Sequence, residues 1–458
     1  MSLQVSSPSE SALSTAAEKR AIYLANLLDV SKRSPTTSPW LKELRDHATV
    51  RVQEQTFPTT RDEEWRFTDL SALLQTPLVA VEQPVVSLSL EAIAPFILPE
   101  AKASQLVFVN GKYAPHLSCV TDLPEAIVIG NLSTLAGTDG ERLRPYLAQQ
   151  PGAEEVFTAL NTTGLSDAAL VLVPKGVAID TPIHLLFIAT ASNTASNTAL
   201  IQPRVLVVAE TNSAATLIED YGAIGSGTYF NNSVTEIWIA ENAQVNHTRV
   251  QRDGHHAFHI GKTAVSQART SRYTCNAMSM GAQLSRHHLE IYQTGEQTET
   301  TLNGLTLLHG DQIGDTHSAI ALTHPHGTTR QLHKCIIDDR AHAIFNGKVF
   351  VPKAAQLTDA GQLNRNLLLS SKARVDTKPQ LEIVADNVKC THGATVGQLE
   401  ADEVFYLQSR GIDVSDARQL LVYAFAFEVI DQIAIASLRR TLAELVQCRS
   451  MGLRKAKI

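Results

Sequence analysis

Two short Cys/His pairs in this chain could bind a metal, because both residue types are metal ligands and the spacing brings them together. The first pair is His333-Lys-Cys335 and the second is Cys390-Thr-His392. One residue separates the members of each pair, so on a β-strand both side chains would project from the same face. Thiolate and imidazole both ligate transition metals, and the soft thiolate favours iron–sulfur chemistry. Two donors are too few for a closed site, so either pair would need completion by a partner chain, a substrate or water. Structural packing is the alternative for both pairs.

Histidines are crowded in the middle of the chain. Twelve of the sixteen lie between His247 and His342. The crowd includes the pairs His255-His256, His287-His288 and His324-Pro-His326. Neighbouring residues on a strand point to opposite faces, so a doublet rarely chelates one ion. The sequence has no HExxH, HxxEH or zinc-ribbon spacing. We therefore expect these histidines to lie on solvated or packed faces of the fold.

Several common catalytic motifs are missing from the sequence. It has no CxxC, which excludes zinc ribbons, thioredoxin motifs and ferredoxin-type cluster motifs. It has no GxxxxGK[ST] phosphate loop and no GxSxG nucleophile elbow. A carbohydrate-active enzyme would need paired carboxylates, and the candidates are scattered along the chain. They are Asp311, Asp315, Asp338 and Asp339.

Composition limits the class of protein. The 458 residues include 39 Lys and Arg against 46 Asp and Glu, a net charge of −7, which excludes a strongly basic nucleic-acid binder. A hydrophobic content of 44% indicates a globular chain rather than a disordered one. Five cysteines, an odd number, exclude a disulfide scaffold and favour a reducing compartment. No apolar run approaches the roughly 18 residues of a membrane span, and no secretory signal is evident. We expect a cytoplasmic protein.

The elements that must position these residues are mostly strands. No proline occurs between Pro203 and Pro325, and strands inside a sheet exclude proline. Short segments rich in β-branched residues follow one another without helical patterns between them. A meander, sandwich or barrel fits this spacing, but the many small polar residues along the strands favour a β-solenoid. The predicted strands include Val205–Val208, Thr216–Ile218, Val234–Ile239, Val245–Val250 and Leu289–Tyr292.

Helical patterns mark both ends of the chain. After a flexible start, a helix is predicted over about residues 16–30. Near the other end, a short helix around residues 405–407 would end at Gly411. Ser415 would cap the next helix, and another would cover about residues 433–445. The predicted organisation is an N-terminal helical region over 1–100, a β-helix core over 101–399 and a C-terminal helical domain over 400–458.

A series of motifs resembles a known family. The segment 386–397, Asp-Asn-Val-Lys-Cys-Thr-His-Gly-Ala-Thr-Val-Gly, is similar to the signature of the SufB/SufD family of iron–sulfur cluster assembly scaffolds. Similar elements occur in the family's order over about residues 317–427, and the segment 61–69 resembles an N-terminal family element. The matching segments include Gln331–Lys334, Ala343–Gly347, Leu367–Ser370, Thr377–Ile383 and Phe405–Ile412. Many matching elements in the family's order are a far more specific sign of the family than any single element.

Two features resemble the SufD branch of this family rather than the SufB branch. Gly393 follows the Cys-x-His, where SufB-like chains usually carry an acidic residue. Many SufB-like chains also have an N-terminal motif of several cysteines, whereas the first cysteine here is Cys119.

The resemblance implies a right-handed parallel β-helix flanked by N-terminal and C-terminal α-helical domains. It implies a non-catalytic scaffold subunit that assembles with SufB and with the ATPase SufC. Cys390 and His392, at the SufB interface, would be metal ligands of a transient iron–sulfur cluster shared with that partner. SufC would dock on the C-terminal helices, where Tyr406 and Arg410 are the candidate partner-binding residues.

Other possibilities stay open at this point. The resemblance implies a link to reduced flavin, which the sequence itself neither supports nor excludes, and the chain alone could form a homodimer. A purely structural β-helix subunit is the main alternative, and in it Cys390 and His392 would bind no iron. A β-helix carbohydrate-active enzyme is the other. His333 and Cys335 are expected to be core or surface residues.

Overall fold

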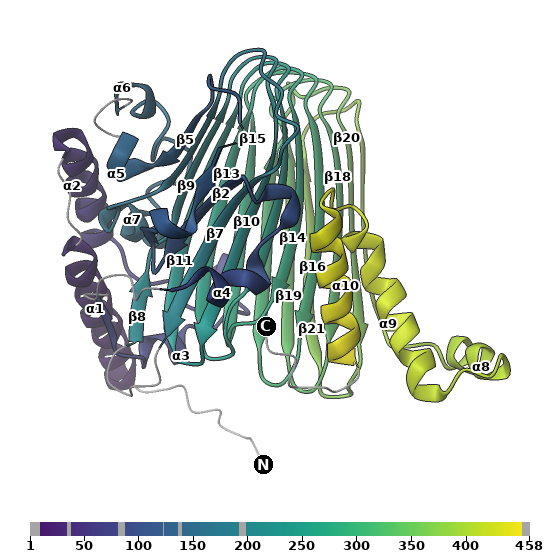
Figure 1. Cartoon of the computed structure of the whole chain (residues 1–458). Helices are drawn as coiled ribbons and strands as arrows, with labels where there is room; N and C mark the ends of the chain where they lie inside the picture. Colours follow the sequence, from purple (N-terminus) through teal and green to yellow (C-terminus); the bar gives the residue numbers. More distant parts are fainter. Residues whose placement is uncertain are drawn as a thin grey trace.

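A computed structural model describes residues 10–33, 38–80, 88–121, 123–135, 140–191 and 198–450 of the chain. Figure 1 shows a long stack of strands with helices from the two ends of the chain on opposite sides of it. The flexible start that the sequence predicts falls on residues 1–9, outside the described residues. The helix predicted over 16–30 is confirmed as α1, Glu10–Lys32.

Strands are the main element of the described chain and form two sheets. The first sheet contains β1 (Leu78–Ala80), β5 (Val128–Asn131), β6 (Ala169–Val173), β8 (Thr198–Ile201), β9 (Arg204–Ala209), β11 (Tyr229–Ile239), β13 (Phe258–Gln267), β15 (Leu284–Gln293), β17 (Ile313–Ala321), β19 (His342–Val351) and β21 (Arg374–Ile383). The second contains β2 (Ser104–Val109), β3 (Lys112–Tyr113), β4 (Cys119–Val120), β7 (Ile183–Ala191), β10 (Ala214–Gly225), β12 (Gln244–Arg252), β14 (Arg272–Met280), β16 (Glu299–Leu308), β18 (Thr328–Ile337), β20 (Asp359–Leu368) and β22 (Lys389–Gly397).

The chain winds between the two sheets as a parallel β-solenoid. From β9 onward it places one strand in the first sheet and the next in the second, and each strand pairs in parallel with the strand one coil away. The solenoid predicted from the sequence is therefore confirmed, and a sandwich is excluded. All five predicted strands lie within β9, β10, β11, β12 and β15.

The coils differ in length, which explains why no strict repeat is visible in the sequence. The register between neighbouring strands advances by 27 residues at Arg272↔Glu299 and by 31 at Thr328↔Asp359. What repeats is a backbone conformation. At the corner before each strand of the second sheet from β10 to β20, one non-glycine residue has a φ between 53° and 61°. These residues are Asn212, Asn242, Thr270, Gln297, His326 and Leu357.

The corner residues have little in common except their backbone. Each of them donates its N–H to a carbonyl of the next coil, as Asn242 does to Arg269 at 3.0 Å. The left-handed region is costly for residues other than Gly and Asn, so the ladder of the solenoid must hold the others there. His326, from the His324-Pro-His326 pair, is one of these corner residues, which accounts for its position without a metal.

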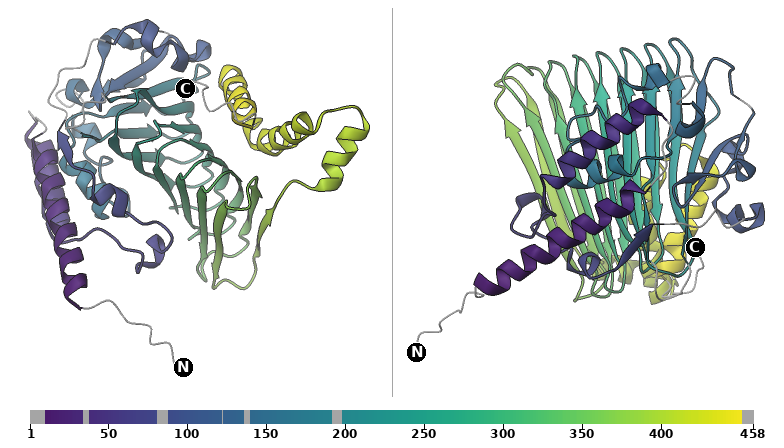
Figure 2. Two further views of the ribbon diagram at one scale, coloured as in Figure 1. Left: turned by 90° about the horizontal axis from the view of Figure 1, so that it is seen from below. Right: turned by 90° about the vertical axis from the view of Figure 1, so that its left-hand side faces the viewer.

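Helices cover the outer faces of both sheets. They are α1, α2 (Pro39–Gln53), α3 (Ser71–Leu74), α4 (Leu90–Ile93), α5 (Leu132–Leu135), α6 (Gly140–Leu143), α7 (Val156–Thr163), α8 (Ala401–Ser409), α9 (Val414–Ile430) and α10 (Ala436–Ser450), with 3₁₀ turns η1 (Glu63–Trp65), η2 (Ala94–Phe96), η3 (Pro99–Ala101) and η4 (Pro115–Leu117). Leu27 and Phe157 of the N-terminal helices share a buried cluster with Phe258 of the first sheet. Ala426 and Leu438 of α9 and α10 pack with residues of the second sheet. Figure 2 shows the N-terminal and C-terminal helices on separate sides of the stack.

The C-terminal helices follow the sequence prediction except at one cap. Gly411, with φ +85°, follows α8 as expected. The sequence predicts Ser415 as the N-cap of α9, but this is wrong. Asp413 is the N-cap, and its carboxylate accepts the backbone N–H of Ser415 at 2.8 Å. Both residue types cap helices well, so the sequence alone could not separate two candidates two positions apart.

The interior between the sheets is mainly apolar but also contains buried charges. Glu219 accepts hydrogen bonds from the hydroxyls of Tyr221 at 2.7 Å and Thr235 at 2.9 Å, and it lies 3.1 Å from Nε2 of His247. Burial opposes a charge on His247. Its hydrogen bonds with Cys275 and Glu219, and the Glu219 charge, nevertheless raise its pKa to about 9. The fold thus holds His247 as a cation beside a carboxylate.

This pair makes stability depend on pH. Because the pKa of His247 rises from 6.5 to about 9 on folding, its contribution is fully present below pH 6.5 and is lost as pH rises through 9. We expect the melting temperature of the protein to fall between these values. In His247→Asn this part of the pH dependence should disappear, whereas His256→Asn, at an exposed histidine, should keep it. The same slope in both variants would contradict the assignment.

Candidate metal site at the open end of the solenoid

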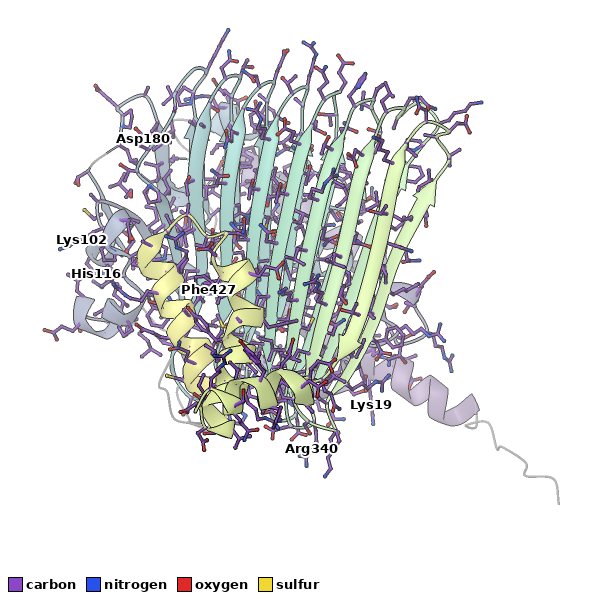
Figure 3. All side chains as sticks on the ribbon, turned by 90° about the vertical axis from the view of Figure 1, so that its right-hand side faces the viewer. Lys19, Lys102, His116, Asp180, Arg340 and Phe427 are labelled. Carbon is purple, nitrogen blue, oxygen red and sulfur yellow. The ribbon has the colours of Figure 1, made fainter. Side chains whose placement is uncertain are left out.

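The solenoid ends at β21 and β22, and neither strand is covered by a further coil. Among the described residues, β21 pairs only with β19 in its sheet and β22 pairs only with β20. Both strands therefore present an unpaired backbone edge, and exposed apolar side chains accompany it. Val384 is 58% exposed and Val396 is 51% exposed. In Figure 3 the strands lie side by side, and this end of the stack is at the right, where the strands are light green. An uncovered edge of this kind is a template for pairing with another chain.

Cys390 and His392 lie together on the inward face of β22. Cys390 is aligned with Ala360 and His392 with Gln362, and both of these β20 residues are buried inside the solenoid. Cys390 is partly buried against the interior cluster, whereas His392 is exposed. The structure thus brings the two residues to one face at the open end, as their spacing predicts.

The environment of Cys390 favours its protonated form. Burial is the main cause, and together with the charge of Asp359 it raises the pKa of the thiol despite a hydrogen bond with the backbone of Ala360. A metal that binds here must displace this proton, so binding would depend on pH and on additional ligands.

A groove lies at the same end of the solenoid. Its volume is about 570 Å³, and it reaches His392. Arg330 and Asp359 form an ion pair of 2.8 Å in its wall, and Glu428 of α9 closes one side. The groove connects the last coil with the C-terminal helices.

The site is incomplete within this chain. In the described part of the chain, no group of three or more His, Cys, Asp or Glu residues is arranged to hold a metal ion. Cys390 and His392 supply one soft and one borderline donor, a combination that suits iron or an iron–sulfur cluster. The remaining ligands would have to come from outside the chain.

The second Cys/His pair lies in the core, in agreement with the sequence expectation that it is structural. His333 is buried, stacks on Phe345 at 5.0 Å and bonds to the hydroxyl of Thr306 at 3.0 Å. Burial lowers its pKa to about 4 and raises the pKa of Cys335 to about 12. Gly304 makes room for the imidazole, because a Cβ there would lie 2.1 Å from it. This pair is closed to solvent.

Five of the twelve crowded histidines are buried and the others are partly or fully exposed, which agrees with the predicted packed or solvated faces. His247 pairs with Glu219, and His259 lies 2.7 Å from a carboxylate oxygen of Asp253. These buried contacts were not predicted from the sequence. To predict them, the length of each coil would have to be known. Coil length sets the register between strands, and only the register reveals which residues of successive strands face each other inside the solenoid.

The scattered carboxylates do not form a catalytic pair. Asp315 is buried and bonds to Arg286 and to Thr68. Asp311 is exposed and forms a two-point ion pair of 2.7 Å with Arg340 at a corner. These contacts position the chain, and they give no support to a carbohydrate-active enzyme.

The N-terminal motif at residues 61–69 attaches the N-terminal region to the first sheet. The guanidinium of Arg286 lies 4.0 Å from the ring centroid of Trp65. Glu64 lies 3.1 Å from Nδ1 of His317, and this hydrogen bond is the main reason that the pKa of Glu64 falls to about 2. The motif therefore makes structural contacts that can form only when the solenoid has folded.

The candidate docking residue Tyr406 lies on α8, which projects beyond the stack (Figure 1), and Arg410 directly follows this helix. Arg410 lies over the ring of Tyr406 at 5.4 Å, and no residue of α8 is buried. Phe405 is 69% exposed and Tyr406 is 58% exposed. Behind α8, the ammonium of Lys334 anchors α9 by bonding to the carbonyl of Phe425 at 2.8 Å and to Glu428. A projecting apolar helix on a fixed base is typical of a contact surface for another protein.

Two family models cover most of the chain. The SufBD protein N-terminal region matches residues 25–185, and the SUF system FeS cluster assembly, SufBD core domain, matches residues 188–425, just over half of the chain. The chain belongs to the SufBD family. The core match contains β22 with Cys390 and His392, and it contains α8 with Tyr406 and Arg410.

Relatives of this SufBD-family chain agree with the family models. An iron-sulfur cluster assembly SufBD family protein of Synechocystis sp. is 52% identical over 86% of this chain and 88% of its own length. The iron-sulfur cluster assembly protein SufD of Escherichia coli is 30% identical over 92% of this chain and 94% of its own length. SufD of Bacillus subtilis is 25% identical over 89% and 93%. Among the described residues, no helix is long and apolar enough to cross a membrane.

Proposed function

We propose that this chain is a non-catalytic, SufD-type scaffold subunit of iron–sulfur cluster assembly, which works in the cytoplasm and pairs with SufB through its last coil. The observation that carries the proposal is the open end of the solenoid, where unpaired edges of β21 and β22 accompany the half-site of Cys390 and His392. A SufB chain that adds its own strands would satisfy the edges and supply further thiolates. A second copy of this chain could cover the same edges when SufB is missing.

A divided site suits the task of a scaffold. Four thiolates on one chain would hold a cluster too tightly to release it. One thiolate and one imidazole on this chain, with the other ligands on SufB, would let a change at the interface open the site. The cluster is thus cargo that the two chains share, and it is not a permanent cofactor of either.

The C-terminal helices would link this interface to SufC. Glu428 of α9 lies in the wall of the groove that reaches His392, and α8 follows β22 directly in the chain. ATP hydrolysis in a SufC bound to α8 could move these helices and change the interface by a rigid-body rotation. Lys334, which holds α9 through Phe425 and Glu428, would be the pivot.

We expect His392→Ala and Cys390→Ala to abolish most cluster formation on a complex reconstituted with SufB and SufC. Each removes one of the two donors of this chain, so the cluster would lose a ligand. The measurement is the visible absorbance of the cluster, with complex formation checked by size-exclusion chromatography. Thr395→Ala is the matched control, because Thr395 lies on the same strand and faces outward. If both donor variants form clusters as well as the wild type does, this chain supplies no cluster ligand and is a purely structural subunit.

The docking surface has a separate test. Tyr406→Ala or Arg410→Ala should weaken SufC binding by about tenfold or more, because exposed Tyr and Arg residues are frequent interface hot spots. Calorimetry on the complex with SufB measures the affinity. The control is Arg272→Ala, at an exposed arginine of the solenoid that is paired with Glu299 at 3.3 Å. If SufC binds all variants equally, α8 is not its docking surface.

A further inference from the structure

One corner of the solenoid contains a notch caused by a short turn. Three successive turns that follow strands of the second sheet are 253–257 after β12, 281–283 after β14 and 309–312 after β16. The middle turn is the shortest. Gly281 permits it, because its φ is +121° and a Cβ there would lie 2.3 Å from the carbonyl oxygen of Asp253. The two longer turns therefore stand on either side of a gap.

Two histidines meet across this notch. His255 comes from the first long turn and His309 from the other, two coils apart, and their Nε2 atoms are 3.2 Å apart. Their ring centroids are 4.7 Å apart at an angle of 67°. The His309 turn is tied down, because the side chain of Gln312 accepts the N–H of His309 at 3.1 Å and donates to the carbonyl of Ala282 at 2.8 Å. The meeting of the two rings is thus built into the corner.

The separation of the two nitrogens matches that of two ligands on one metal ion. In a tetrahedral site with metal–nitrogen bonds of about 2.0–2.1 Å, two ligand nitrogens lie about 3.3–3.4 Å apart. The observed 3.2 Å needs only a small rotation of either ring to reach this value. Imidazole nitrogen is the donor that zinc, nickel, copper and iron accept most readily in proteins.

The surroundings leave room for the remaining ligands. The notch opens into a cavity of about 590 Å³, lined also by Asp339, Arg340 and Lys372. Arg340, labelled at the lower end of the strands in Figure 3, marks this corner. Asp311 is engaged by Arg340, and a carboxylate oxygen of Asp339 accepts the N–H of Gly310 at 2.9 Å. Since the described residues offer no group of three metal-binding side chains, water would fill the other positions.

We propose that His255 and His309 form a bidentate binding site for a divalent transition-metal ion, with water completing the coordination. The site is exchangeable, since only two protein donors hold the ion and the cavity is open to solvent. It goes beyond the proposed function and is separate from the half-site on β22. Cys390 is aligned through β20 and β18 with Thr300, nine residues before His309 on the same coil. At about 3.3 Å per strand residue, the two sites are roughly 30 Å apart.

The test uses the full-length chain carrying Cys390→Ala and His392→Ala, so that the β22 half-site cannot contribute. Cobalt(II) is the probe, because nitrogen ligation gives it visible absorption bands, and equilibrium dialysis with zinc gives the stoichiometry. We expect one ion per chain. His255→Ala and His309→Ala should each weaken binding by more than the roughly 10–100-fold that changes around the ligands cost. His256→Ala is the matched control, since this exposed neighbour is on the same turn.

Each outcome decides the proposal. Loss of the ion in the His255 and His309 variants, with binding kept in His256→Ala, supports it. Equal binding in all variants, or no binding in the parent chain, overturns it and leaves the two rings joined by a hydrogen bond only. Circular dichroism checks that the variants fold. His255→Ala is expected to fold normally, because this side chain is exposed. A failure here leaves the roles of Cys390 and His392 untouched, because both are absent from every chain in the test.

Discussion

The structure depends on the hydrogen-bond ladder that joins each coil of the solenoid to the next. Every strand from β9 to β20 has neighbours on both sides, so its backbone groups are satisfied within the chain. The ladder holds corner residues such as Thr270 and Leu357 in a left-handed conformation that they would otherwise avoid. It also stacks the inward side chains, so that Glu219 and His247 meet in the interior. Among the described residues the ladder stops at β21 and β22, whose outer backbone edges are unpaired.

The end of the hydrogen-bond ladder also determines how exposed the candidate site is. Cys390 and His392 continue rows of inward side chains that are buried one coil earlier, at Ala360 and Gln362. If one more coil covered them, Cys390 and His392 would be core residues like His333 and Cys335. That pair has a similar sequence pattern and is closed to solvent. What separates a candidate ligand pair from a packing pair is thus position in the stack.

Much of the fold could be predicted from the sequence, and the reasons for the exceptions are physical. β-Branched segments such as 234–239 identify strands, and the many small polar residues along these strands favour a solenoid over a sandwich or barrel. The N-cap of α9 was misassigned because Asp413 and Ser415 are equally good candidates. The shared face of Cys390 and His392 follows from their spacing. That this face points inward does not, because it depends on the register, and their exposure does not, because it depends on which coil is last. The meeting of His255 and His309 could not be predicted, since it requires the lengths of three successive turns.

The most direct test of the central claim is hydrogen–deuterium exchange of the chain alone and with SufB. If SufB covers the open end, the backbone amides of β21 and β22 should exchange much more slowly in the complex. Those of β14, which is paired on both sides in the isolated chain, should not change. A stable complex in which β21 and β22 exchange as fast as in the chain alone would contradict the account and place the interface elsewhere.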